Sequence, residues 1–439
     1  MSGARPSEAP RPRRPTFWAR VLPILYFELY LNFTVVLFAF GPWPWPVKNP
    51  VKLYGFLACA HLALLLGYMC AAFRRPAAYN GRWTVEGVVK ASLIVSALLL
   101  LPTVWFRTGA ILPDLGAALA DLGRTYEETN RLRAEGKPFV EYVRIAFGLW
   151  LSWLLPLSVF YWKRLGAGVR IASLSVIGSS IVMWIALGTN KGIGDVVLLI
   201  PAMLVAGHLS GISRLSLAQA VALAVVVGLL AVGFVTFFSA AIASRQRSDE
   251  VSDTFAVLDI RADPSNVFMR YVPRNMQSAV RGLAMYLNVG YYGLSLALEK
   301  PFLPTWGVGS SPVTIRQAER FLGEGSVARR TYPYQIEMDG WDANGLWSSF
   351  YPWIASDVSF PGTIVVVFLV GYNFGLAWVD SLRGANPFAV AMAANFVIML
   401  YYFPSNNQLF YSMETGVASI VTFVLWRLSR KTPREGSRR

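Results

Sequence analysis

The sequence predicts an all-α protein that crosses a membrane about ten times. Hydrophobic residues make up 55% of its 439 residues and charged residues only 15%, and the mean hydropathy is +0.45. Uncharged runs such as 221–243 and 363–379 approach or reach the ~20 residues that a helix needs to cross a bilayer. The composition excludes an ordinary set of water-soluble domains, because their surfaces need more charge.

Ten apolar segments qualify as spanning helices, and they set the expected domain organisation. Residues 1–16 form an expected disordered cytoplasmic tail, rich in Pro and Arg, with no evident signal peptide. Seven spans fall in a membrane domain over 17–243, three in 362–428, and a basic cytoplasmic tail follows at 429–439. The predicted spans lie near 21–41, 53–73, 86–106, 143–161, 170–188, 192–209, 217–243, 362–380, 387–404 and 408–427.

The distribution of positive charge predicts that both termini are cytoplasmic. The net charge is +15, and much of the excess lies in the two tails and in short turns between the helices. With the N-terminus inside, the inside segments carry roughly twice as many Lys and Arg residues as the short outside segments. Membrane insertion therefore explains the basic character, and we expect no nucleic-acid partner.

Two long segments are expected on the outside. The first, 107–142, has the alternating charge of an amphipathic helix lying on the bilayer surface. The second, 244–361, contains a semi-apolar stretch, 279–298, which cannot cross the membrane without placing the basic C-terminal tail outside. We expect this stretch to be re-entrant or interfacial. Irregular backbone at membrane depth needs protein or water around it, so a cavity is expected at the outer face.

Lys191 is the first candidate for binding an anion. It stands in the external turn Gly-Thr-Asn-Lys-Gly at 188–192, where backbone N–H groups and the start of the next helix converge with the ammonium. Such a combination binds phosphate. Two alternatives stay open, an anchoring role at the membrane interface and an ion pair with Asp195, four residues further along the helix.

A group of arginines in the second external segment is the other candidate for binding a diphosphate. No acidic residue occurs in 264–298, so Arg270, Arg274 and Arg281 lack local partners, and the guanidinium fork suits phosphate oxygens. Arg245, at the end of the seventh span, is a further candidate. Contact with lipid headgroups or with acidic residues just upstream is the alternative.

Aromatic and acidic residues are mixed in the last part of this segment, as in carbohydrate sites. Aromatic rings stack on the apolar faces of sugars, and carboxylates accept hydrogen bonds from hydroxyl groups. An aromatic belt at the membrane interface is the alternative. Asp357 is the expected general base, with a helix-capping role as its alternative. The candidate glycan-binding residues are Tyr332, Tyr334, Asp339, Trp341, Asp342 and Trp347.

Other classes of site receive little support from the sequence. The two His and two Cys residues form no cluster with metal-ligand spacing, so we expect no metal. Motifs for nucleotide hydrolysis and for serine hydrolases are absent from the sequence. Glu28 and Glu414 lie within predicted spans, where a charge is costly, so both should face the bundle or a cavity. Whether they serve structure or function stays open.

Three short motifs are similar to those of a known family. They are the turn 188–192, Arg281 ahead of 283–286, and the aromatic stretch 347–362, which ends Ala-Ser-Asp-Val-Ser-Phe-Pro-Gly. With the helix count and loop layout, they resemble the Wzy-type O-antigen polymerases, also called oligosaccharide repeat-unit polymerases. The stretch from Asp357 departs from the usual Gly-containing form of that family.

The resemblance implies a metal-independent, GT-C-like glycosyltransferase without a cofactor, in the bacterial inner (cytoplasmic) membrane. Such an enzyme transfers a growing O-antigen, capsule or exopolysaccharide chain from undecaprenyl diphosphate to a new lipid-linked repeat unit at the periplasmic face. A chain-length regulator protein is a possible partner. By the same resemblance, Lys191 and Arg281 would bind the departing diphosphate with support from Arg274, and Asp357 would act as base ahead of Asp339 and Asp342.

Two other functions remain as alternatives. An O-antigen ligase-like transferase shares the layout and the donor, but members of that family typically use a His in the large external loop. Residues 244–361 contain none. A polysaccharide or lipid transporter needs charged or discontinuous helices near mid-bilayer, and only Glu28 and Glu414 approach that.

Overall fold

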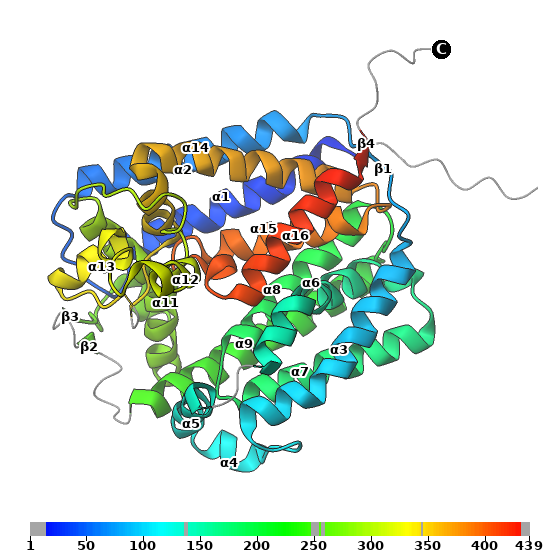
Figure 1. The fold of residues 1–439 in the computed structure, drawn as a ribbon, viewed down its shortest axis with the longest axis horizontal. Helices are drawn as coiled ribbons and strands as arrows, with labels where there is room; N and C mark the ends of the chain where they lie inside the picture. Colours follow the sequence, from blue (N-terminus) through cyan, green and yellow to red (C-terminus); the bar gives the residue numbers. More distant parts are fainter. Residues whose placement is uncertain (1–14, 136–138, 247–253, 256–259, 344–345, 432–439) are drawn as a thin grey trace, which may run out of the picture.

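The computed structural model describes residues 15–135, 139–246, 254–255, 260–343 and 346–431. Nearly all of the regular structure is α-helical (Figure 1). Each predicted span corresponds to a helix. These helices are α1 (Phe17–Phe40), α2 (Pro50–Ala72), α3 (Val85–Thr108), α6 (Phe139–Phe160), α7 (Ala167–Ala186), α8 (Lys191–Leu209), α9 (Leu217–Gln246), α14 (Phe350–Ser381), α15 (Pro387–Tyr402) and α16 (Met413–Ser429).

Length and hydropathy identify a multi-pass membrane protein. Within the described ranges, eight helices are long and apolar enough to cross a membrane, namely all of those above except α15 and α16. These two helices have 16 and 17 residues, which is just short of a full crossing. They nevertheless connect the same two ends of the bundle as the eight longer helices.

One end of the bundle holds both described ends of the chain, and we call it the termini end. The indole of Trp378 donates to the carbonyl of Ala19 at the start of α1 (2.8 Å). The short strand β1 (Ala78–Tyr79) pairs antiparallel with β4 (Arg430–Lys431), directly after α16. The η1 turn (Trp162–Arg164) also lies here. The two described chain ends therefore lie on one side of the bundle.

The opposite end, which we call the loop end, carries most of the remaining chain (Figure 1). Helix α11 (Gln277–Ala297), together with short helices, strands and turns, forms a layer over the ends of the long helices. The other elements of this layer are α4 (Leu115–Ala120), α5 (Leu122–Glu135), β2 (Thr254–Phe255), β3 (Ile260–Arg261), α10 (Val267–Arg270), η3 (Arg274–Met276), α12 (Pro312–Leu322), η4 (Ala328–Arg330), α13 (Tyr332–Gln335), η5 (Ile336–Asp339) and η6 (Gln408–Phe410).

The predicted amphipathic helix of 107–142 does not lie alone on a surface. Helix α5 packs against α9 and against the turn between α7 and α8. Gly188 has a φ of 59°, and a Cβ at this position would lie 2.6 Å from the carbonyl oxygen of Leu122. Glycine therefore serves two purposes, because it allows the left-handed backbone and the close approach of α5.

Helix α14 starts earlier than predicted. The predicted span began at 362, but the helix runs from Phe350 to Ser381 and is broken at Ser359 (φ 64°, ψ 170°). Pro361, two residues later, has no N–H to donate, which favours a break here. The aromatic stretch before the break is therefore helical rather than a loop, and Phe350 stacks on Phe403 with ring centroids 4.1 Å apart.

Helix α11, predicted as re-entrant or interfacial, is a continuous helix that runs across the direction of α1, α2 and α14 in Figure 1. Its second half, from Asn288 to Ala297, is buried. Glycine permits this contact, since a Cβ at Gly290 would lie 2.4 Å from the carbonyl oxygen of Pro404. The helix is thus packed tightly against the chain that links α15 to α16.

Candidate functional site

The link between α15 and α16, residues 403–412, is a buried polar segment that we call the connecting segment. Ser405, Asn406, Asn407 and Gln408 are all buried there. The hydroxyl of Ser405 donates to the carbonyl of Tyr286 (2.6 Å), and the amide of Asn407 donates to the carbonyl of Ser310 (2.7 Å). The predicted spans left only 405–407 between two helices and placed Gln408 in the last span, although four consecutive polar residues between two apolar runs were a usable signal.

Lys191 lies beside the connecting segment, at the start of α8. Its Nζ is 3.2 Å from Oδ2 of Asp195, so the ion pair allowed by the sequence is confirmed. The hydroxyl of Tyr402, the last residue of α15, donates to Oδ1 of the same carboxylate (3.2 Å). Lys191 therefore shares its charge with an acidic partner, although its side chain stays partly exposed.

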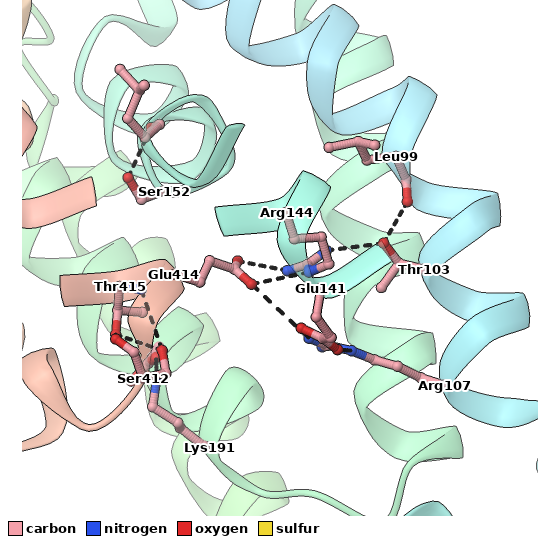
Figure 2. A network of polar contacts seen from close by, with 12 residues as sticks. Leu99, Thr103, Arg107, Glu141, Arg144, Ser152, Lys191, Ser412, Glu414 and Thr415 are labelled. Carbon is pink, nitrogen blue, oxygen red and sulfur yellow. Dashed lines mark hydrogen bonds and ion pairs between the residues drawn. The ribbon is translucent and has the colours of Figure 1, made fainter. Parts of the chain in front are cut away.

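Four charged side chains form a network where α3, α6 and α16 meet (Figure 2). Arg144 binds Glu414 through Nε–Oε2 (3.0 Å) and Nη2–Oε1 (2.6 Å), and Arg107 binds Glu141 through Nε–Oε1 (3.0 Å) and Nη2–Oε2 (3.1 Å). Arg144 also donates to the hydroxyl of Thr103 (3.0 Å). Two positive and two negative charges balance, which is how buried charges are tolerated.

This network answers the open question about Glu414, which faces the bundle as predicted. Arg107 fell in the predicted external segment 107–142 and Arg144 at the start of a predicted span, and both are buried within helices. Two bidentate arginine–carboxylate pairs fix the relative positions of three helices. We therefore interpret the network as structural support for the loop end rather than as a ligand site.

Arg281 lies on α11 and is only 8% exposed. Its backbone carbonyl accepts a hydrogen bond from the indole of Trp43 (2.9 Å). Asn288, seven residues further on the same helix face, is 0% exposed, and its amide makes no hydrogen bond with the described part of the chain. A buried polar group of this kind needs a physical explanation. Sequence analysis noted Asn288 only as an interruption of an apolar stretch.

The other predicted phosphate ligands are less favourably placed. Arg270 and Arg274 are exposed. Arg270 lies near Asp263, whose pKa is lowered chiefly by hydrogen bonds from Ser265 and in a smaller part by this arginine. The side chain of Arg245, the remaining predicted phosphate ligand, lies outside the part of the chain that the structure describes.

Lys191 and Arg281 belong to two different helices. Their helices, α8 and α11, both pack against α9. A recess of about 380 Å³ opens near the end of α1, but neither cation lines it. Its walls include Trp43, Trp45 and Asp263. The rings of Phe38 and Tyr292 stack on Trp45, which places this indole in the core.

The carboxylate of Asp357, the predicted general base, accepts hydrogen bonds at both of its oxygens. Its Oδ1 accepts hydrogen bonds from the hydroxyl of Thr305 (2.6 Å) and from the N–H groups of Gly307 (2.8 Å) and Gly309 (2.9 Å). Its Oδ2 accepts one from the N–H of Ser310 (2.8 Å). The carboxylate is therefore engaged by four donors and anchors the loop 305–310. These contacts give Asp357 a structural role, while its role as a general base stays a prediction. It does not cap the start of a helix, because it lies inside α14.

Two of the six predicted glycan-binding residues, Tyr332 and Trp341, are core residues. Trp341 is 0% exposed and packs on Tyr292, and Tyr332 is buried against Phe360. The ring of Trp347 is half-buried against Tyr286, and Tyr334 packs on an apolar cluster around α12. The buried rings of Trp341 and Tyr332 cannot stack on a sugar in this packing. The rings of Trp347 and Tyr334 keep part of their surface exposed, so their role in glycan binding stays a prediction.

The predicted acidic residues differ in their environments. Asp339 forms an ion pair with Lys300 (2.9 Å), whereas Asp342 is exposed. Near them, burial raises the pKa values of Tyr334 and Tyr411, and the positive charge of Arg316 opposes both shifts. Arg316 is exposed on α12 and is a loop-end cation that sequence analysis missed.

A second acidic group lies within the membrane helices. Nδ1 of His61, near the middle of α2, is 3.3 Å from Oε2 of Glu28 in α1. The remaining Oε1 of Glu28 and Nε2 of His61 are buried and make no hydrogen bond with the residues that the structure describes. Glu28 thus faces the bundle as predicted, with a histidine as its partner.

Among the described residues, no group of three or more His, Cys, Asp and Glu side chains has the geometry of a metal site. Comparison with known proteins gives no similarity to a protein-family model, to a curated protein or to a solved structure.

Proposed function

We propose that this protein is a glycosyltransferase that polymerises undecaprenyl-diphosphate-linked oligosaccharide repeat units. The loop end would face the periplasm from the bacterial inner membrane, and both termini would be cytoplasmic. The product would be an O-antigen, capsule or exopolysaccharide. The proposal rests on the three sequence motifs that resemble the Wzy-type polymerases and on the buried polar residues of the connecting segment at the loop end.

The observation that carries the proposal is the buried position of Arg281. At 8% exposure, the guanidinium is held inside the protein rather than in solvent, so its position is largely fixed before a ligand arrives. It lies on α11, which packs on α1 and on the buried polar connecting segment. In glycosyl transfer from a lipid diphosphate, negative charge develops on the departing diphosphate, and a fixed cation stabilises that charge in the transition state.

The roles of the other residues follow from their contacts. Lys191 is already paired with Asp195, so it would assist by exchanging this partner for phosphate as the product forms. Asp357 anchors a loop, and Asp339 is paired with Lys300. Asp357, Asp339 and Asp342 stay the candidates for the base, and Asp342 is the exposed member of this set.

Reconstitution without an ion gradient tests the proposal. Purified protein in liposomes, supplied with undecaprenyl-diphosphate-linked repeat units, should form polymer. Arg281→Ala should lower the rate about 100-fold or more, as expected for the loss of a transition-state charge contact. Arg281→Lys should recover part of the activity, and the exposed control Arg274→Ala should change it little. Normal polymer from Arg281→Ala would contradict the role of Arg281.

A transporter is the second candidate, and one observation favours it. Transporters use ionisable side chains and interrupted helices at membrane depth, and this protein has the Glu28–His61 pair and the break in α14 at Ser359. The same liposomes distinguish the two functions. Translocation of the lipid-linked unit without new glycosidic bonds, and its loss in Glu28→Gln, would replace the enzyme with a transporter.

A further inference from the structure

Trp306 is displayed on the surface of the loop end in an unusual backbone conformation. The residue is 77% exposed and has a φ of 51°, in the left-handed region that large side chains rarely adopt. No burial of its ring offsets this strain. Strained residues of this kind persist where the surrounding structure holds them, and they gather at ligand-binding sites.

The surroundings of Trp306 hold it firmly. It lies in the loop 305–310, whose N–H groups and Thr305 hydroxyl make four hydrogen bonds to Asp357. The loop is also closely packed, since a Cβ at Gly309 would lie 2.1 Å from Oγ1 of Thr305. The carboxylate expected to be a base thus fixes the backbone on both sides of an exposed indole.

A guanidinium covers part of this indole. The Cζ of Arg330 lies 4.6 Å from the ring centroid of Trp306, within cation–π distance. Its Nε donates to the carbonyl of Pro304 (2.9 Å), which fixes the side chain beside the ring. The two terminal amino groups of Arg330 make no hydrogen bond within the described ranges. An exposed ring and fixed N–H donors are therefore held side by side.

We propose that Trp306 and Arg330 form a platform for one pyranose ring of the glycan. The indole would stack on the apolar face of the sugar, and the amino groups of Arg330 would donate hydrogen bonds to its hydroxyl or carboxylate oxygens. Because both groups are fixed before binding, little conformational freedom is lost when the sugar arrives. This inference rests on the proposed function and adds a glycan subsite separate from Arg281.

Anchoring in the headgroup region is the competing explanation for an exposed tryptophan. The following helix, α12, exposes the charged side chains of Arg316 and Arg320. The same helix also exposes Phe321 and Leu322, so α12 alone does not separate water from lipid. The observation that favours a sugar is the guanidinium of Arg330, held beside the ring with N–H groups that can donate to sugar oxygens. We therefore assign Trp306 to the glycan, and contact with lipid becomes an outcome of the test.

Direct binding of lipid-free sugars tests the platform. Full-length protein in lipid nanodiscs is titrated with chitotetraose, maltotetraose and an α-1,6-mannotetraose, and saturation-transfer NMR and tryptophan fluorescence report binding. At least one of the three sugars should bind. Trp306→Ala should raise the Kd of that sugar about tenfold, because a stacking contact is lost. Trp306→Tyr should recover part of the affinity. Trp18→Ala, which removes an exposed indole at the termini end, is the matched control and should change nothing.

Three results would overturn the platform. They are the absence of binding by all three sugars, an unchanged affinity in Trp306→Ala, and quenching of Trp306 fluorescence by brominated acyl chains. The quenching signal is taken as the difference between wild type and Trp306→Ala.

Sugar binding should persist in Arg281→Ala, which is expected to be impaired in polymerisation. Binding without polymerisation in the wild type would thus remove the proposed enzyme function and leave the platform standing.

Discussion

The two ends of helix α14 each carry an aspartate that holds other parts of the chain, and they do so differently. At the termini end, Asp380 is 2% exposed and accepts from the N–H of Ala77, the indole of Trp426 and the guanidinium of Arg430 (2.8, 3.1 and 2.5 Å). At the loop end, Asp357 accepts only neutral donors, all from the single loop 305–310.

The two aspartates therefore differ in what they hold: Asp380 joins buried parts of the bundle, whereas Asp357 holds a surface loop. Asp380 joins the chain before α3 to the end of α16 and neutralises the Arg430 guanidinium, so it stabilises the packing of the bundle. Asp357 holds a surface loop with an exposed indole. The buried amides of the connecting segment and Arg281 also belong to the loop end. We therefore expect substitutions at the termini end to change stability and those at the loop end to change binding.

The largest effect on stability is expected from Asp380→Ala. This change leaves the Arg430 guanidinium, which is mostly buried, without its carboxylate, and breaking such a pair costs about 3–5 kcal/mol. Thermal unfolding in detergent should show a clearly lower melting temperature. Asp380→Asn keeps the shape of the side chain and should lose less. An unchanged melting temperature in Asp380→Ala would contradict the claim that Asp380 stabilises the bundle.

Asp357→Ala should have a smaller and local effect. Water can replace the lost partners because the site is partly exposed, so the expected cost is about 1–3 kcal/mol. Hydrogen exchange should become faster in residues 305–310, while the membrane helices keep their protection. If Asp357→Ala lowers the melting temperature as much as Asp380→Ala, the loop 305–310 is part of the bundle core, and the two aspartates do not differ in their effect on stability.

The smallest effect is expected at the break in α14. Ser359 has a backbone conformation that is nearly restricted to glycine, so Ser359→Gly should relieve strain and stabilise the fold by about 1 kcal/mol. The melting temperature should rise slightly, and polymer formation should be unchanged. A lower melting temperature would mean that the hydroxyl group contributes more than the strain costs.

The helices were predictable because long apolar runs bounded by charge have few alternatives in a membrane. Each predicted span overlaps a helix, and the pairing of Lys191 with Asp195 followed from helical spacing. The start of α14 was missed because its first half is polar and aromatic, although Pro361 marked the break.

Contacts between distant segments account for the other errors. Nothing local indicates that Asp357 binds a loop about 50 residues earlier, or that Trp341 is buried beneath α11. The charged network was missed because Arg144 pairs with Glu414, 270 residues later, and Arg107 pairs with Glu141 on another helix. Trp306 drew no attention because its unusual φ is invisible in the sequence.

Binding of undecaprenyl diphosphate, without any sugar, tests the central claim most directly. The lipid is titrated into nanodiscs that carry wild type, Arg281→Ala or the exposed control Arg274→Ala. If the loop end binds the diphosphate at Arg281, the Kd should rise at least about tenfold in Arg281→Ala, the loss of one charged contact, and change little in the control. Equal affinity in all three proteins would contradict the account.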